Sequence, residues 1–304
     1  MSAVPGPRVD SSPTTSASPT PELSGPINMR YYLTKGLEGV ERKKFSGGPA
    51  FTEAIESKAG ELRSLDPNGG QYVVFSSVGR KDFACVNRIR NDNYKGLRFL
   101  YLENEETLIV KTTFQALPGL VSVRLLDILR MKIVAMGLGD VLLNVGSMRF
   151  KGKHSSKEAH CGLKPSSFRP SKDGWPTLVF ECGVSKSGIR LGADASWWLQ
   201  NSQGEVKIVL VLKASEEDRK IELEQWEMDA STNPHGSRRP TRTQKVTIVA
   251  PRGSRAVATA PFSLNFNKIF LRDPEPAKGE KDIVFSKKEL EKKFAEHVWK
   301  FACK

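Results

Sequence analysis

The sequence has few cysteines and no long apolar run. Its 304 residues include four cysteines and no CxxC pair, which argues against a disulfide framework and favours free thiols in a reducing compartment. A zinc site from His154, His160, Cys161 and Cys182 is conceivable, but the spacing matches no usual zinc pattern. No stretch approaches the roughly 18 apolar residues of a membrane span, and the N-terminus has no basic segment followed by an apolar one. We therefore expect an intracellular protein, cytoplasmic or nuclear, that is neither secreted nor membrane-bound.

Large apolar residues and negative charge are also scarce in parts of the chain. Residues 1–28 are rich in Ser, Pro and Thr, so we expect a disordered tail there. The formal net charge is +13, and residues 231–304 hold 16 Lys and Arg against 7 Asp and Glu. A basic surface attracts polyanions and favours nucleic acid, with DNA as a better candidate than RNA. The same charge can also serve solubility alone.

Apolar periodicity divides the rest of the chain into three regions. Residues 29–115 are predicted to form an N-terminal β-rich extension of unknown role, with strands at 72–75, 99–102 and 108–110 and a helix at 52–65. Residues 116–230 indicate helix, three strands, helix and two strands, which predicts an α/β core with a mixed central sheet flanked by helices. Residues 231–304 form a basic C-terminal region ending in an amphipathic helix, which Ser286 caps and which packs on the core.

One acidic residue stands out in this pattern. Glu181 ends the apolar strand 177–182, where a buried carboxylate is costly unless a cation, a metal or strong hydrogen bonds compensate. Metal-dependent nucleases need a carboxylate at such a strand end, because Mg²⁺ held there polarises a phosphate and activates water. The alternative is that Glu181 lies at a solvated rim or pairs with a neighbouring lysine.

Several ordered blocks carry a family resemblance. They include Lys-Glu-Ala-His at 157–160, Trp-Pro-Thr-Leu-Val-Phe-Glu-Cys-Gly-Val-Ser at 175–185, and the blocks at 146–147, 194–199, 201–202 and 204–210. In these blocks the chain resembles a group of uncharacterised fungal proteins related to the PD-(D/E)xK, restriction-endonuclease-like superfamily. The similarity covers roughly residues 114–230 and touches the final helix at 294–299. It implies a restriction-endonuclease-like core.

The resemblance also implies where a nuclease site would lie. The first motif acid falls at His160, where the family tends to have Lys-Glu-Ala-Asp, and the second matches Glu181. The motif lysine falls at Gly183 and is missing, so Lys186 or Arg190 would have to substitute. Imidazole suits Zn²⁺ or Mn²⁺ better than Mg²⁺, so His160 and Glu181 make a thin metal-ligand set. The site therefore looks catalytically degraded.

Four further residues or motifs allow more than one interpretation. Asp194 lies near the buried stripe of helix 189–200 and needs a partner, either Arg190 or the backbone of the next strand. Trp197 and Trp198 are predicted to anchor the core. The Glu-x-Lys at 205–207 is more simply a surface pair than a second site.

Our leading hypothesis is a degenerate nuclease-fold protein that has weak or no cleavage activity and associates non-specifically with nucleic acid. A set of basic residues would contact phosphates around the site without reading sequence: Lys151, Lys153, Lys157, Lys164, Arg169, Arg238 and Arg239. One alternative is an active Mg²⁺- or Mn²⁺-dependent nuclease that uses Glu181, His160 and Lys186 or Arg190. Another is a protein-interaction module on the same scaffold.

Overall fold

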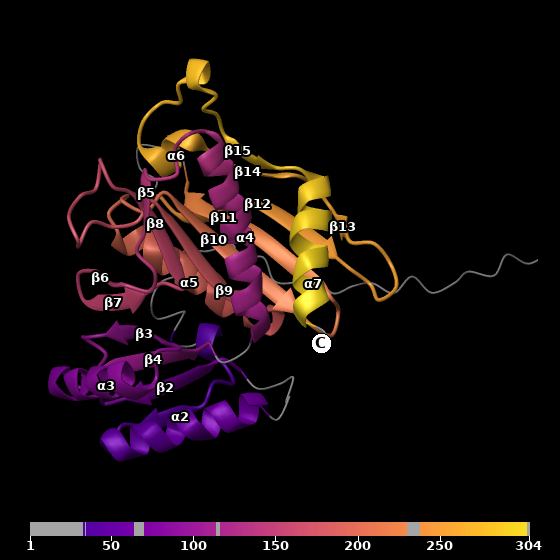
Figure 1. Ribbon diagram of the computed structural model, residues 1–304. Helices are drawn as coiled ribbons and strands as arrows, with labels where there is room; N and C mark the ends of the chain where they lie inside the picture. The colour runs from indigo at the N-terminus through magenta and orange to yellow at the C-terminus, as the bar shows by residue number, and fades with distance from the viewer. Residues whose placement is uncertain (1–32, 34, 64–69, 114–115, 230–237, 303–304) are drawn as a thin grey trace, which may run out of the picture.

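The chain folds as an α/β protein, as the sequence predicts, and it has two large mixed sheets where one central sheet was expected. Figure 1 shows the computed structural model, which describes residues 33, 35–63, 70–113, 116–229 and 238–302. The predicted disordered tail, residues 1–28, lies outside the described residues. Within the described part, no helix combines the length and apolar character that crossing a membrane requires.

The first sheet has six strands in the order β1-β2-β4-β3-β7-β6. Its bounds are β1 Arg42–Lys44, β2 Tyr72–Ser76, β3 Leu97–Leu102, β4 Thr107–Thr112, β6 Arg149–Lys151 and β7 Ser155–Glu158. Helices α2 (Gly48–Arg63) and α3 (Arg80–Asn93) cover its outer face (Figure 1). A short 3-10 turn, η1 (Lys35–Leu37), precedes β1. The N-terminal region is therefore richer in helix than the expected β-rich extension.

The second sheet has seven strands in the order β13-β12-β11-β10-β9-β8-β5. Its bounds are β5 Leu142–Asn144, β8 Cys161–Pro165, β9 Leu178–Val184, β10 Ile208–Ser215, β11 Lys220–Met228, β12 Pro240–Val249 and β13 Val257–Ala258. Only β9 and β10 pair in parallel, and α5 (Gly188–Asn201) connects them after the short turn η2 (Ser185–Ser187). A parallel pair requires such a crossover, whereas antiparallel neighbours do not.

Helices cover both faces of this second sheet. On one face lie α4 (Ala116–Ala135) and the C-terminal helical segment, η4 (Glu289–Ala295) and α7 (Glu296–Ala302), side by side (Figure 1). The same apolar core receives α6 (Phe266–Phe270) and the hairpin of β14 (Phe262–Leu264) and β15 (Ile283–Phe285), with η3 (Pro276–Lys278) in the connection between them. The other face packs on α5, and beyond α5 on the first sheet.

Strand alternation decides which side chains enter which core. Along β9, Leu178, Phe180 and Cys182 face α4, whereas Val179 faces α5 and the first sheet. Because successive side chains of a strand point to opposite faces, Glu181 shares the face of Val179. The carboxylate of Glu181 is thus held between the two sheets.

Several predicted elements are confirmed, with changed boundaries. The strands expected at 72–75, 99–102 and 108–110 are β2, β3 and β4, and the helix expected at 52–65 is α2, which begins at Gly48. Ser286 does cap the final helix: its Oγ accepts a hydrogen bond from the Glu289 N–H at 3.3 Å. Leu290, Phe294 and Val298 are buried against the core, while Phe301 is 50% exposed.

The segment that contains Lys151, Lys153 and Lys157, which were expected to contact phosphates, belongs largely to the first sheet. Residues 155–158 form β7, which pairs with β3 and so joins the sheet of the N-terminal region. The alternation of β7 sends Lys157 towards the second sheet, while Glu158 has its hydrogen-bond partners in α3 and β3. The polar sequence of this segment reflects two buried ion networks, one on each face of a strand.

Candidate functional site

The predicted pair of Glu181 and His160 lies at the end of one strand ladder. Antiparallel pairing of β8 with β9 ends with Cys161 opposite Phe180, and His160 lies in the bend immediately before β8, while Glu181 follows Phe180 in β9. The charge of Glu181 acts on the His160 imidazole, so the two side chains are near one another. The structure therefore brings together the two positions that the resemblance singles out.

Glu181 is saturated by protein donors. Its carboxylate is 1% exposed, and Lys111 Nζ of β4 lies 3.1 Å from Oε2. Lys157 Nζ of β7 lies 3.2 Å from Oε1, which also accepts a hydrogen bond of 2.8 Å from the Trp198 indole N–H. Two ammonium groups from the first sheet thus hold the carboxylate of the second sheet.

Asp194 belongs to the same network. Lys157 Nζ lies 2.7 Å from Asp194 Oδ1, and the Tyr72 hydroxyl donates to Oδ2 at 3.0 Å. The prediction that Asp194 needs a partner is confirmed, but neither Arg190 nor the next strand supplies these two contacts. Lys111, Lys157, Glu181 and Asp194, which we call the buried ion cluster, carry two positive and two negative charges. As a set they are neutral.

The electrostatics of the buried ion cluster favour the charged forms of Glu181 and Lys157. Burial raises the pKa of Glu181, but Lys157 and Lys111 outweigh burial and bring this pKa down to about 2. Burial lowers the pKa of Lys157, but Asp194 and Glu181 outweigh it and raise the pKa above its ordinary value. For His160 burial prevails and, with the charge of Lys111, lowers its pKa to about 4. His160 is therefore a neutral imidazole at pH 7.

The space beside Gly183, where the motif lysine is missing, is occupied by the side chains of Gln71 and Leu191. A Cβ at Gly183 would lie 2.6 Å from Gln71 Oε1 and 3.3 Å from Leu191 Cδ1. Gln71 is 2% exposed, and its Oε1 accepts a hydrogen bond of 3.2 Å from the Val184 N–H. A longer side chain at residue 183 thus requires Gln71 to move.

Of the two proposed substitutes for that lysine, Arg190 is engaged elsewhere. The Arg190 guanidinium donates to the carbonyl oxygens of Gly36 at 3.1 Å and Glu38 at 3.3 Å, and it lies over the ring of Tyr72. These contacts attach the segment around η1 to α5. The side chain of Lys186 lies outside the described residues.

Three of the basic residues expected to face nucleic acid are buried instead. Lys157 is part of the buried ion cluster, and Lys164 is 1% exposed with Nζ donating to the Ser171 carbonyl at 2.5 Å. Arg169 pairs with Glu205 at 3.0 Å and donates to the Trp175 carbonyl. Their charges are used inside the fold: Lys157 and Lys164 are turned inward by strands β7 and β8, and Arg169 by its contacts in the loop after β8. Glu205 consequently does not pair with Lys207, which donates to the Gly204 carbonyl.

The other basic residues are on the surface. Lys151 and Lys153 are exposed at the turn between β6 and β7. Arg238 and Arg239 are exposed immediately before β12. Contact of these four residues with nucleic acid stays a prediction.

Glu158 cannot supply a second acid to the site. Its Oε1 accepts hydrogen bonds from Arg90 of α3 and, at 2.6 Å, from Arg149 of β6. Its Oε2 accepts one of 3.1 Å from the backbone N–H of Phe99. Glu158 therefore serves a separate ion network on the outer face of the first sheet.

Lys111 and Tyr72 are the parts of the site that the sequence analysis missed. Lys111 follows three apolar residues in β4 and is 4% exposed, as though it were a core position. A lysine in an apolar strand signals a buried partner, but its partner Glu181 is 70 residues away.

Trp197 and Trp198 were predicted as core anchors, and both are buried at 2% and 0% exposure.

A divalent metal does not fit this arrangement. Hard cations bind through several free oxygen ligands, whereas ammonium groups and an indole N–H already contact both oxygens of Glu181. Across the described ranges, no three His, Cys, Asp or Glu residues are grouped in a way that could hold a metal ion. The buried ion cluster has the chemistry of a structural network.

Comparison of the chain with protein-family models and with curated proteins gives no match. The resemblance to restriction-endonuclease-like proteins therefore stays a prediction.

Proposed function

We propose that this chain is a nuclease-fold protein in which lysine ammonium groups stand where a catalytic metal would be, so that it binds nucleic acid without cleaving it. The observation that carries the proposal is the saturation of Glu181 by Lys111, Lys157 and Trp198. A carboxylate with two ammonium partners in a neutral set gains little by exchanging them for a hydrated Mg²⁺.

The order of elements supports the nuclease ancestry. The segment from α4 to β10 has helix, three antiparallel strands of the second sheet (β5, β8 and β9), helix, and a strand parallel to β9. A mixed sheet flanked by helices is consistent with the core that the resemblance implies. The proximity of His160 and Glu181 is consistent with the same ancestry.

Net charge supports the nucleic-acid part of the proposal. Each exposed Lys or Arg that contacts a phosphate releases counterions, so affinity falls with salt in proportion to the number of contacts. Lys151 and Lys153, at the turn between β6 and β7, and Arg238 and Arg239, before β12, are exposed and so are suited to such contacts.

The test measures binding and cleavage together. Fluorescence anisotropy with a labelled DNA duplex of about 20 base pairs should show binding whose logarithm falls linearly with the logarithm of salt. Lys151→Ala with Lys153→Ala should lower that slope by roughly 1 to 2. The matched control is Lys278→Ala with Lys281→Ala, two exposed lysines of the η3 region, which should leave the slope unchanged.

Two outcomes would overturn the proposal. One is Mg²⁺- or Mn²⁺-dependent cleavage that Glu181→Ala abolishes, which would favour the active nuclease. For that alternative the specific observation is the position of Lys111 Nζ, 3.1 Å from Glu181, where it could act in place of the missing motif lysine. The other outcome is an absence of binding at low salt, which would favour an interaction module.

A further inference from the structure

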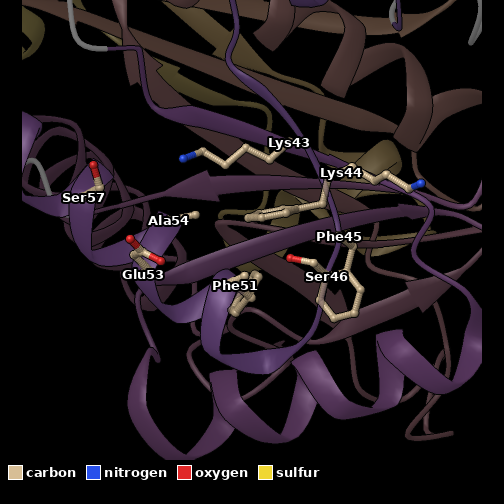
Figure 2. A pocket seen from close by; sticks show the side chains of 10 residues that line it. Lys43, Lys44, Phe45, Ser46, Phe51, Glu53, Ala54 and Ser57 are labelled. Carbon is tan, nitrogen blue, oxygen red and sulfur yellow. The ribbon is translucent and has the colours of Figure 1, made fainter.

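A pocket of about 250 Å³ lies between the edge strand β1 and helix α2, on the face of the first sheet that α2 covers. Its floor is apolar and includes Phe51 and Ala54 of α2 and Phe75 of β2. Polar side chains, among them those of Lys43 and Glu53, stand at its rim (Figure 2). Apolar and polar residues line the pocket in equal numbers, so an inserted side chain would find apolar contacts at the floor and polar groups at the rim.

The backbone beside this pocket has an open edge. β1 pairs in parallel with β2 on one side, and no strand pairs with its other side in the described part of the chain. The backbone carbonyl of Glu41 accepts a hydrogen bond from the Val74 N–H, and the Phe45 N–H donates to the backbone carbonyl of Ser76. The backbone groups of these alternate residues therefore face β2. By the alternation of parallel pairing, the backbone groups of Arg42 and Lys44 point to the outer edge.

The side chains of β1 divide by face and by charge. Figure 2 shows Lys43 and Lys44 leaving the strand in opposite directions, with Glu53, Ala54 and Ser57 of α2 on the Lys43 side. Lys43 pairs with Glu41 at 2.9 Å. Arg42 and Lys44 share the other face and are both exposed. Lys44 also borders the pocket. The edge thus offers a pocket with an apolar floor together with two exposed cations, Arg42 and Lys44.

The positive charges on β1 determine which kind of strand can pair with its outer edge. Lysines on an edge strand oppose pairing between identical edges, because like charges would face one another. A second copy of β1 is therefore disfavoured, whereas an acidic strand is attracted. We propose that β1 receives an extended acidic peptide of a partner protein as an added strand, with an apolar side chain in the pocket and acidic side chains against Arg42 and Lys44. This mode of recognition combines main-chain hydrogen bonds with pockets for alternate side chains.

The probe is a fluorescein-labelled peptide, Glu-Val-Glu-Phe-Glu-Val-Glu, which alternates acidic and apolar residues. The matched control, Glu-Glu-Val-Phe-Val-Glu-Glu, has the same composition and charge without the alternation. Fluorescence anisotropy with the full chain should show binding at low salt that is at least about tenfold tighter for the alternating peptide. Equal binding of the two peptides, or no binding of the first, would overturn the proposal.

Three variants locate the contact. Lys44→Pro removes the N–H that points to the outer edge and should weaken binding about tenfold more than Lys44→Ala, which removes only the charge. Ala50→Met, at a half-buried position lining the pocket, should weaken binding several-fold by filling it. Arg42→Glu with Lys44→Glu should reverse the preference in favour of a Lys-Val-Lys-Phe-Lys-Val-Lys peptide.

A second readout covers a Lys44→Pro variant that does not fold. Hydrogen exchange of the wild-type chain should show slower exchange at residues 42–44 when the alternating peptide is added, and no change with the control peptide. Protection confined to other segments would contradict the assignment to β1. Self-association that Lys44→Glu abolishes would instead identify a second copy as the occupant.

Discussion

Substitution of Glu181 by glutamine tests whether the buried ion cluster stabilises the fold. Glu181→Gln keeps the size of the side chain and leaves the cluster with one uncompensated positive charge between two sheets. Removing one partner of a buried ion pair costs about 3–5 kcal/mol. The lowering of the Glu181 pKa to about 2 from an ordinary 4.5 agrees, since it corresponds to on the order of 3 kcal/mol. At about 2 °C per kcal/mol, the melting temperature should fall by roughly 6–10 °C.

The acid range gives an independent check. The folded pKa of Glu181 is depressed, so its contribution to stability is present above pH 4.5, the unfolded pKa, and is lost as the pH falls towards 2. Glu181→Gln should lack that part of the acid dependence. Urea unfolding of both proteins at several pH values below 5 measures the difference.

A charge-restoring double variant separates this account from simple damage. Lys111→Met in the Glu181→Gln background returns the buried ion cluster to neutrality and should recover more than half of the lost stability. Glu205→Gln is the matched control, because its side chain is 52% exposed in its pair with Arg169; it should cost less than about 1 kcal/mol. Unchanged or increased stability of Glu181→Gln would refute the reasoning, because an acid kept for catalysis commonly lowers stability.

Three further predictions concern the surroundings of Glu181. Burial lowers the pKa of His160 to about 4, whereas in the unfolded chain this imidazole takes up its proton near pH 6.5. The wild type should therefore lose on the order of 2 kcal/mol of its free energy of unfolding as the pH falls between these values, and His160→Gln should not. Urea midpoints that shift equally for both proteins between pH 7.5 and 5 would contradict this. Gly183→Lys should destabilise the chain by about 1–3 kcal/mol because its Cβ meets Gln71, and thermal melts should show partial relief when Gln71→Ala is added. Lys157→Met should cost about 3–5 kcal/mol in urea unfolding, far more than Lys132→Met, whose pair with Glu289 is partly exposed; similar losses would argue against the network.

Local sequence patterns located much of the fold because the signals are local. The doubly apolar runs at 177–182 and 206–212 predicted β9 and β10, and the apolar stripe with Trp198 predicted the helix between them. Helix α3 was missed because charged and polar residues dominate its sequence, and Val86 alone among its residues is buried. A helix that buries so little has no apolar stripe to distinguish it from a loop.

The site was only half predictable, for a physical reason. A carboxylate at an apolar strand end had to be compensated, so a cation or metal beside Glu181 could be inferred from the sequence. Which cation it is depends on how two sheets pack, and Lys111 and Lys157 come from strands whose positions no local pattern fixes. Lys157 was therefore expected on the surface, because a lysine turned inward by alternation in β7 looks identical in sequence to an exposed one.

Binding of Mn²⁺ tests the central claim most directly, because Mn²⁺ tolerates both carboxylate and imidazole ligands. Electron paramagnetic resonance of free Mn²⁺ during titration with wild-type protein and with Glu181→Ala reports any site at Glu181 and His160. If lysine ammonium groups occupy this carboxylate, the two proteins will deplete free Mn²⁺ to the same small extent. A Mn²⁺ site of micromolar affinity that Glu181→Ala removes would contradict the account.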